Sequence, residues 1–536
     1  MKKILLAFLL SPLALRAQVD FQSSNLPIVL IETNGEEIPN EPKITATMRI
    51  IDNGPGQINH IDDPANAYDG LIGIELRGST SLDLSDKKPY AVETRDVDGE
   101  DLAVPLLGMA EESDWAFLAP FNDKSLIRDA ITLALARRIM PWASNTRYVE
   151  LVLNGEYEGI YLIAEKIKRD KNRVDISKLE PEDVAGDDLT GGYILKLDKT
   201  SGAPSEGWTS PYDFPHNTYY QIEYPKLEDI TPEQKNYIRT WMTDFELSMI
   251  QDDYDEPGHG FQQYLDLESF VDFVIINEIS KNVDAYRLST YLYKDKDSKS
   301  PLLHAGPVWD FNISMGNADY CGGDTYYGWA MDFNDQCPND GWIIPFWWNR
   351  LWDAPAFRQK VQARWNALRA GVFSDLEINN VVDSLYLTVN EAADRNFERW
   401  PILNNWVWPN VYCCGTYQQH YVYLDNWLAD RINWLDGAMQ DIYVGVYDTA
   451  EYFPPKLYPN PNNGTMNFEY YARHGGLVQI EIFDAIGRQT DYVQETVNQH
   501  GDHVFPYSAS LAQGIYYYTV RIDGKEASKG RFVVHP

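Results

Sequence analysis

The sequence has little positive charge and little cysteine. Its 45 Lys and Arg residues are outnumbered by 80 Asp and Glu residues, which gives a formal net charge of −35. This balance excludes nucleic-acid binding through a basic face and indicates a solvated, acidic surface. The four cysteines are Cys321, Cys337, Cys413 and Cys414. No His or Cys recurs at the spacing of a zinc site, so these cysteines do not predict a metal centre.

Long apolar runs are also absent after the first residues. The chain begins with two lysines close to Met1, continues with the apolar run Ile4–Leu10, and has a small residue at Ala17. This pattern is typical of a secretory signal peptide, so we expect residues 1–17 to be removed on export. No later stretch approaches the length of a transmembrane helix, and we therefore expect no transmembrane segment.

Export would allow the cysteines to form disulfides. Bridges could join Cys321 and Cys337 to the adjacent pair Cys413 and Cys414, and the sequence does not choose the pairing. His304 stands alone just before the end of a predicted strand, where a core or surface position suits it.

What the sequence does have is a large apolar fraction, 44% of 536 residues, which is enough for two or three domains. Strand patterns fill the first half. They are Leu26–Ile31, Ile72–Leu76, Ala91–Glu93, Val149–Leu153, Tyr157–Ile163 and Gly191–Leu197. The dipeptide Asn154-Gly155 joins two of them and predicts a tight hairpin.

Helical spacing dominates after about residue 230. The predicted helices are Thr231–Met249, Leu265–Ile279, Pro355–Leu368 and Tyr421–Met439, and two short helices are expected on either side of Asn396–Trp400. An earlier helix, capped by Asp123 or Ser125, is expected to continue through Ile139 before Pro141 stops it.

One stretch in the middle of the chain carries a pattern that suits chemistry. Tyr291–Tyr293 is a predicted strand, and a second strand is expected from Leu302 to Trp309 after a polar turn. Asp284 precedes the first strand and Asp310 follows the second, so a hairpin would bring the two carboxylates close together. Such a pair suits a proton acceptor and a divalent cation, for which oxygen ligands are required.

Two strings in this stretch resemble the CotH family, the spore-coat protein H type of atypical protein kinase. They are N-x-D-A-Y-R-L-S-T-Y-L-Y at 282–293 and G-P-V-W-D-F-N-x-S-x-G-N at 306–317. Family-like strings also occur at R-G-S-T-S…K-K-P-Y (77–90), D-x-S-L-I-R (123–128) and N-G-E-Y-x-G-I-Y-L-I-A-E-K-I (154–167). The resemblance covers roughly residues 25–440 and implies a two-lobed kinase-like domain.

The resemblance implies roles for the residues of the central stretch. Asp284 corresponds to the catalytic Asp and Asp310 to the Asp that holds Mg2+, with help from Asn312. Many kinases place a second metal ligand, Asn, five residues after the catalytic Asp, where this chain has Ser289. Some family members also have Asp in place of Asn312. Both changes weaken the metal ligand set.

The same resemblance implies residues for nucleotide binding. Arg77 and Lys88 would neutralise the phosphate charge of ATP, and Glu165 would lie near its adenine or ribose. The sequence does not show whether Asp123, Asp129 or neither pairs with Lys88. A G-x-G-x-x-G motif is absent, so an ordinary protein-kinase glycine loop is not expected.

The end of the chain resembles a different family. Short strands are predicted at Val478–Phe483, Gly514–Val520 and Lys529–Val534, separated by turns, which indicates a small β-sandwich. The Y-P-N-P start, the central D-x-x-G-R, G-I-Y and the final G-R-F-V-V resemble the type IX secretion (Por) sorting domain. This implies handling by the type IX secretion machinery and export across an outer membrane, to the cell surface or the medium.

We therefore expect an α+β chain with a two-lobed atypical protein-kinase-like domain at 18–442, a linker at 443–455 and an all-β sandwich at 456–536. The expected activity is Mg-dependent transfer of the ATP γ-phosphoryl group to Ser or Thr of a protein substrate. The alternative is a weak or inactive pseudokinase that acts as a cell-surface binding or adhesion protein. A metal-dependent hydrolase built on His304, Asp310 and Asn312 is the least favoured reading.

Overall fold

The computed structural model describes residues 19–199, 206–213, 218–256, 258–442, 456–460, 462–472, 476–485, 487–497, 501–522 and 525–534. The predicted signal peptide, 1–17, and the predicted linker, 443–455, lie outside these residues. The chain divides into two compact units, Met1–Met439 and Gln440–Pro536, and each is described by itself below. The domain boundaries expected from the sequence remain a prediction.

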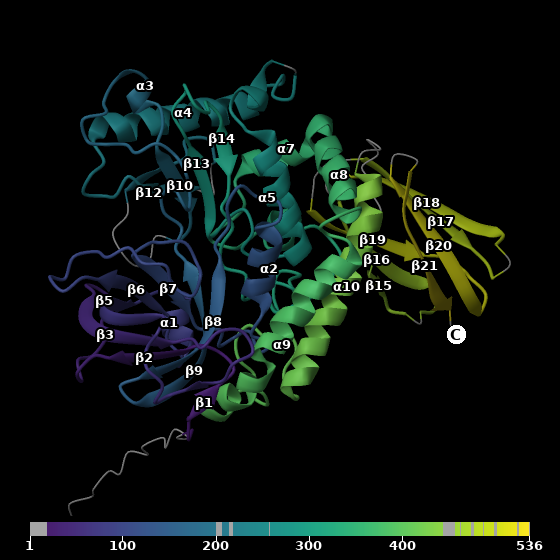
Figure 1. The fold of residues 1–536 in the computed structure, drawn as a ribbon. Helices are drawn as coiled ribbons and strands as arrows, with labels where there is room; N and C mark the ends of the chain where they lie inside the picture. Colours follow the sequence, from purple (N-terminus) through teal and green to yellow (C-terminus); the bar gives the residue numbers. More distant parts are fainter. Residues whose placement is uncertain are drawn as a thin grey trace, which may run out of the picture. The chain divides into compact units, whose positions relative to one another are not determined.

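The first unit begins with a closed barrel of seven strands in the order β2-β3-β5-β6-β7-β9-β8 (Figure 1). The strands are β2 Ile28–Glu32, β3 Ile44–Ile51, β5 Tyr68–Leu76, β6 Tyr90–Arg95, β7 Asp114–Leu118, β8 Thr146–Leu153 and β9 Glu156–Glu165. Alternate residues such as Ile72, Ile74 and Val92 fill the interior, as period-2 patterning requires. A two-stranded ribbon of β1 Ser23–Ser24 and β4 Asn59–His60 accompanies the barrel.

The hairpin predicted at Asn154-Gly155 is present between β8 and β9. Both residues have positive φ, 50° and 77°, the conformation that two-residue hairpin turns need and that Asn and Gly adopt readily. Farther along β9, Gly159 has a φ of 88°, close to an irregularity in the pairing with β8.

A second sheet of five strands follows the barrel, in the order β11-β12-β10-β13-β14. The strands are β10 Tyr193–Leu197, β11 Gly207–Thr209, β12 Tyr219–Tyr224, β13 Thr290–Lys294 and β14 Leu303–Ala305. Lys196 of β10 pairs with Tyr291 of β13, so these side chains share one face. On the other face Tyr193 stacks on Tyr237 of a helix, at 6.0 Å between ring centroids.

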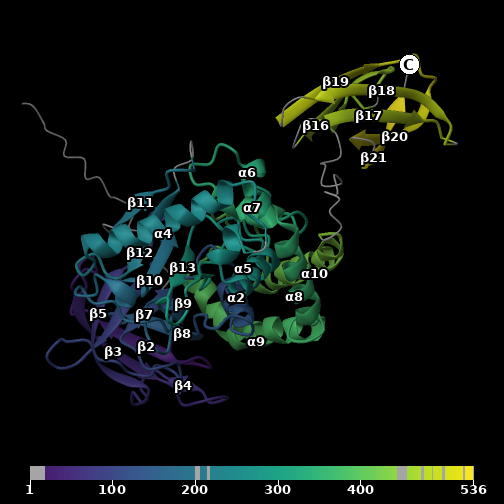
Figure 2. The ribbon, with the colours of Figure 1, turned by 90° about the horizontal axis from the view of Figure 1, so that it is seen from above.

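Helices make up most of the rest of the first unit (Figure 2). The longer ones are α2 Arg128–Ala136, α4 Pro232–Ile250, α5 Leu267–Ser280, α7 Phe346–Asp353, α8 Pro355–Arg369, α9 Asp375–Arg399 and α10 Tyr417–Asp441. Shorter ones are α1 Thr80–Leu84, α3 Gly186–Leu189, α6 Phe333–Gln336 and the 3-10 turns Gly260–Gln263 and Ala330–Asp332. α5 is buried along almost its whole length and contacts α2, α8 and β14.

Local chemistry explains where several helices begin. Thr231 and Gln234 form a reciprocal capping box at the start of α4. Pro355 is the first residue of α8, a position where its missing N–H costs nothing.

Three expectations about these elements are wrong. α2 begins at Arg128 and ends at Ala136, because Asp123 binds Ser125 and Arg128 in a turn before the helix. The two short helices expected around Asn396 are one continuous helix, α9, which runs through this residue. β14 ends at Ala305 instead of reaching Trp309.

Neither disulfide joins one of the first two cysteines to one of the last two. Cys321 pairs with Cys337, and Cys413 pairs with Cys414. The cross-bridges considered from the sequence are therefore wrong.

None of the helices in the described ranges combines the length and apolar composition needed to cross a bilayer.

The second unit is a sandwich of two antiparallel sheets, β15-β16-β19 and β18-β17-β20-β21. Its strands are β15 Lys456–Tyr458, β16 Thr465–Ala472, β17 Gly476–Phe483, β18 Gln489–Val497, β19 Gly501–Ser508, β20 Gly514–Ile522 and β21 Lys525–Val534. The core contains residues of both sheets, among them Phe468, Ile480 and Phe532. The predicted α+β class and the final all-β sandwich are thus confirmed.

Candidate active site

The turn after α5 places Asp284, and the hairpin that follows returns the chain to Asp310. β13 and β14 pair antiparallel, as predicted. Asn282 then joins the two ends: its Nδ2 donates to the Asp310 carbonyl at 3.0 Å, and its Oδ1 accepts from the Asp284 N–H at 3.2 Å. One buried amide side chain therefore fixes the backbone beside both carboxylates.

Asp284 is held by a neighbouring arginine. Its Oδ1 accepts from Arg287 Nη2 at 2.8 Å, and its side chain is 19% exposed. Arg287 also forms an ion pair with Asp340 at 3.3 Å. Burial raises the pKa of Asp284 above its ordinary value, Arg287 and Lys199 oppose this rise, and Asp340 adds to it. A carboxylate with a raised pKa is a better proton acceptor than an ordinary one.

Asp310 is exposed to solvent. Its backbone is left-handed, with a φ of 68°. Neither of its carboxylate oxygens accepts a hydrogen bond from the described residues. Although the side chain is accessible to water, protein atoms crowd around it. This desolvation, together with the charges of Asp284 and Asp198, raises the pKa of Asp310 to about 6. Its oxygens are thus available to a ligand.

Asp129 of α2 supports the turn that carries Asp310. Its Oδ1 accepts the Phe311 N–H at 2.6 Å, and burial and the charge of Asp310 raise the pKa of Asp129 to about 8. Asp123 is bound to Arg128 instead. The Lys88 amine hydrogen-bonds to neither Asp123 nor Asp129.

The two cations expected at the phosphates lie in different surroundings. The Arg77 guanidinium carbon lies 5.3 Å from the centroid of the Trp309 ring, and its charge lowers the pKa of Asp310. Lys88 Nζ donates to the carbonyls of Leu82 and Ser85, each at 2.6 Å, at the end of α1. Arg77 therefore acts on Asp310 and packs on the neighbouring Trp309, whereas the Lys88 amine holds the loop that follows Arg77.

Glu165 is 3% exposed at the end of β9. Its two oxygens accept from the N–H groups of Ala110 and Asn145, at 3.3 and 2.9 Å. These contacts tie two loops to the barrel. A contact with the nucleoside remains a prediction.

Asn312 and Ser289 complete the predicted metal ligands. The Asn312 side-chain amide and the Ser289 hydroxyl have no hydrogen-bond partner among the described residues, while the Asn312 carbonyl accepts from Asn317. Within the described part of the chain, no three His, Cys, Asp or Glu side chains gather as a metal site. Oxygen donors from Asp310 and Asn312 nevertheless fit Mg2+, which is commonly bound through one or two carboxylates and substrate phosphates.

Two residues that sequence reasoning missed lie in the same place. Asp198 and Lys199 follow β10, and both act electrostatically on Asp310. The signal was present in L-K-L-D-K at 195–199, where Lys196 and Asp198 alternate with apolar residues at the end of a strand. His304, by contrast, stacks on Tyr293 and hydrogen-bonds to Ser300.

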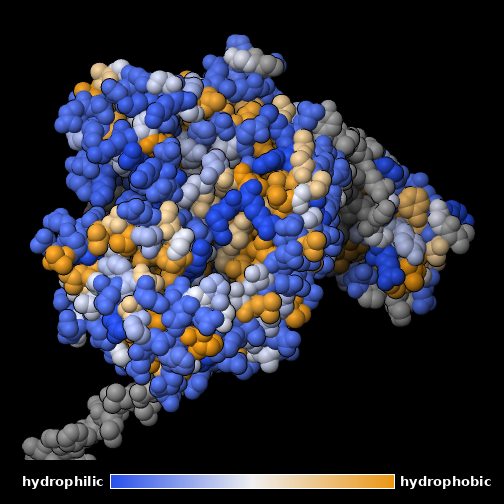
Figure 3. Space-filling model, in the orientation of Figure 1, coloured by the Kyte–Doolittle hydropathy of each residue, from blue (hydrophilic) through white to orange (hydrophobic). Residues whose placement is uncertain are grey.

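The visible surface of the first unit is largely polar, as expected for a chain with 23% charged residues. On the face drawn in Figure 3, hydrophilic residues predominate over the first unit and apolar residues form small patches.

Two family models match the chain, and each match lies within one of the two compact units. A family model described as CotH kinase protein matches residues 74–435, more than half of the chain. A second, described as secretion system C-terminal sorting domain, matches residues 456–535. This sorting domain marks the chain for export to the cell surface or the medium. No curated protein matches the sequence.

Among solved structures, a match is found to the Pseudomonas fluorescens alkylpurine DNA glycosylase AlkC bound to DNA containing an abasic site analog. The identity is 11% over 35% of this chain and 55% of that chain, with a TM-score of 0.14. The chain thus spans about half of that protein's length, and a likeness this weak carries no argument. The family match and the placement of Asp284 and Asp310 lead to one conclusion: the chain belongs to the CotH kinase protein family.

Proposed function

We propose that this protein is an exported kinase that transfers the γ-phosphoryl group of ATP to a Ser or Thr hydroxyl of a protein. The observation that supports this most is the pair of hydrogen bonds from Asn282, which hold the backbone of a proton acceptor, Asp284, and of a second carboxylate, Asp310, in one place. Phosphoryl transfer needs little covalent chemistry from the protein, so positioning and charge are what the site must supply. The type IX secretion machinery is the proposed export partner.

Asp284 would receive the proton of the acceptor hydroxyl. The hydroxyl oxygen forms a bond to the γ-phosphorus while the bond from that phosphorus to the bridging oxygen of the β-phosphate breaks, and ADP leaves. The hydroxyl proton passes to Asp284, whose raised pKa favours this transfer. Arg287 keeps the carboxylate oriented before and after the transfer.

Asp310 and Asn312 would hold Mg2+, with Ser289 nearby in the turn before β13. The metal supplies positive charge where the phosphates develop negative charge. Asp129 keeps the Asp310 turn in place through the Phe311 N–H. Arg77 would neutralise phosphate charge directly, and Lys88 would do so only if its amine left the carbonyls of α1.

A second function is favoured by a specific observation. Ser289 and Asn312 replace stronger metal ligands, so the chain could bind protein partners at the cell surface without transferring phosphate. Failure to bind Mg-ATP would support that function over the kinase.

The test compares the parent with Asp284→Asn in the incorporation of labelled phosphate from γ-labelled ATP, into itself or a Ser-rich protein. Asn keeps the shape but cannot accept the proton, so incorporation should fall about 100- to 10,000-fold. ATP affinity should stay within a few-fold, because the metal ligands are intact. Equal incorporation by both proteins would remove Asp284 from the mechanism.

A further inference from the structure

Lys199 connects the second sheet to the barrel side of the first unit. It follows β10, and its Nζ donates to Thr80 Oγ1 at 3.0 Å. Thr80 is the first residue of α1, within the Arg77–Ser81 loop that follows β5. A lysine from one side of the site thus contacts the loop on the other side that carries the phosphate-binding candidate Arg77.

The charge of the Lys199 side chain acts on three carboxylates, although its amine forms no ion pair with them. The charge of Lys199 lowers the pKa values of Asp284, Asp310 and Asp198, in each case against the larger, opposite effect of burial. Yet Lys199 forms no ion pair within 4.0 Å among the described residues. Its backbone N–H is fixed by Asp198 Oδ1 at 2.8 Å, which anchors the residue while its side chain extends.

The remaining contacts of the Lys199 ammonium are weak ones. Its Nζ lies 5.6 Å from the centroid of the half-exposed Trp342 ring, and its single hydrogen-bond acceptor among the described residues is a neutral hydroxyl. A phosphate oxygen is a stronger acceptor than a hydroxyl for an ammonium group, because it carries negative charge and the hydroxyl does not. Lys88 differs, since its amine already binds two carbonyls.

We propose that Lys199 binds the terminal phosphate of the nucleotide, exchanging its contact with Thr80 for a phosphate oxygen beside Asp310. Together with Arg77 it supplies the positive charge that was expected from Lys88. This inference rests on the proposed kinase function and names a residue of that same site. Because Lys199 and Thr80 belong to opposite sides of the site, the phosphate would lie between them.

The experiment measures binding of Mg-ATP and Mg-ADP to the full chain by calorimetry. Lys199→Gln should weaken Mg-ATP binding at least about tenfold and Mg-ADP binding less, because only ATP carries the terminal phosphate. Lys199→Arg, which keeps the charge, should recover most of the affinity. Lys178→Gln is the matched control, since Lys178 is 60% exposed and forms an ion pair with the exposed Glu180, and it should bind as the parent does.

Thr80→Val separates a phosphate ligand from a structural bridge. It removes the hydroxyl but leaves the lysine, so Mg-ATP affinity should remain within a few-fold of the parent. If Thr80→Val lost as much affinity as Lys199→Gln, Lys199 would act only by joining the two sides, and the inference would be wrong. It would also be wrong if Lys199→Gln bound Mg-ATP as tightly as a binding-competent parent. A parent that bound no Mg-ATP would overturn the kinase proposal, and this inference with it.

Discussion

Lys87 shows how adjacent residues of one string can have opposite surroundings. Its side chain is 1% exposed, and its Nζ donates to the Ile160 carbonyl and to Asn396 Oδ1. No carboxylate lies within ion-pair distance of it among the described residues. Burial therefore lowers the pKa of Lys87 from 10.5 to about 7.

This lowered pKa predicts a pH-dependent stability. The unfolded chain holds the Lys87 proton up to about pH 10.5, while the folded chain releases it near pH 7, so stability rises with pH between these values. Relative to Lys87→Met, the parent should gain unfolding free energy from about pH 7 to about pH 10. Urea unfolding followed by tryptophan fluorescence measures this in the first unit, because every tryptophan lies before residue 440. Parallel stability curves for the two proteins would contradict it.

Asp310 should be needed for metal-dependent nucleotide binding and not for the stability of the folded chain. Its side chain accepts no hydrogen bond from the described residues, so Asp310→Ala should leave the chain folded, with only the small cost of Ala at a φ of 68°. Mg-dependent nucleotide binding should be lost, since the metal contributes several kcal/mol of charge stabilisation. Calorimetry with and without Mg2+ tests this. Binding of Mg-ATP as strong as in the parent would assign Asp310 a structural turn instead.

Among the single residues of the site, the acidic ones were easier to predict from the sequence than the basic ones. Asp284 and Asp310 stand at the ends of a hairpin that local patterns reveal, so their proximity could be expected. Which of Lys87 and Lys88 points inward could not, because that depends on Asn396, more than 300 residues later. Lys199 was missed because its partner Thr80 lies in helix α1, more than 100 residues earlier in the chain.

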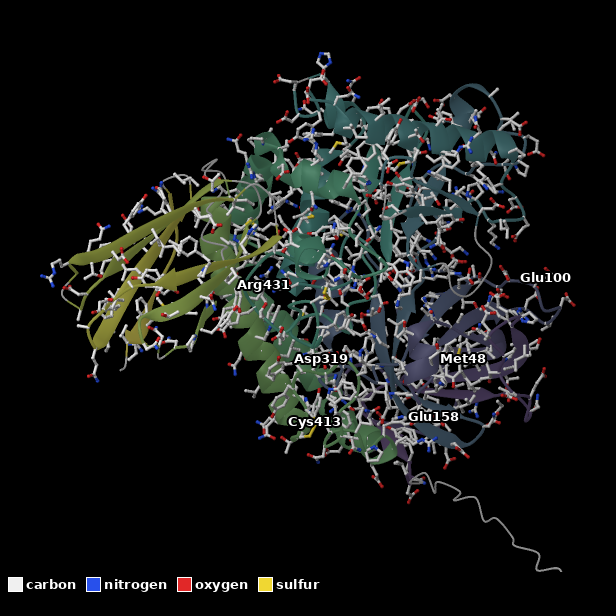
Figure 4. All side chains as sticks on the ribbon, turned by 180° about the vertical axis from the view of Figure 1, so that it is seen from behind. Met48, Glu100, Glu158, Asp319, Cys413 and Arg431 are labelled. Atoms are coloured by element: carbon white, nitrogen blue, oxygen red, sulfur yellow. A yellow bond between two sulfur atoms is a disulfide. The ribbon has the colours of Figure 1, made fainter. Side chains whose placement is uncertain are left out.

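Helix α9 joins the helices to the barrel through its last turns. Asn396 Oδ1 accepts from the Ile160 N–H at 3.1 Å, and Arg399 pairs with Glu158 of β9 at 2.6 Å. Figure 4 labels Glu158 on this strand and Arg431 on α10. The sequence suggested two short helices here, but Ala392, Ala393 and Phe397 continue the buried face of one helix until Pro401 follows it. The element's type was predictable, and its length depended on packing against β9.

The loop between Cys321 and Cys337 braces the end of α5. Lys281 Nζ donates to the carbonyls of Gly322, Thr325 and Tyr327, and its position directly precedes the Asn282–Asp284 turn. The bridge spans a sequence separation of 16, whereas Cys413–Cys414 closes no loop.

Removing the two bridges should therefore have unequal effects. Replacing Cys321 and Cys337 by serine should lower the unfolding free energy of the first unit by about 3 kcal/mol, the amount that chain entropy assigns to a loop of about this length. The same change at Cys413 and Cys414 is the control and should cost far less. Tryptophan-monitored unfolding compares them, and equal losses would refute the loop-closure explanation.

For the whole molecule, the sorting domain and the lysine-flanked apolar start predict processing at both ends. The protein recovered outside its native cell should begin near Gln18 and lack most of the region after about residue 450. Intact mass spectrometry of the recovered protein measures both ends at once. A full-length product confined to the cytoplasm would contradict this.

The pairing of β2 with β8 has a consequence for the order of folding. These strands are parallel and lie about 120 residues apart in the chain, yet their pairing closes the barrel. Contacts between such distant segments form slowly, since a long loop must be ordered first. The barrel therefore cannot close until residues near 150 have been synthesised, and the earlier strands lack their last partner until then. For an exported protein, this delay lengthens the interval in which the chain can still be threaded through a membrane.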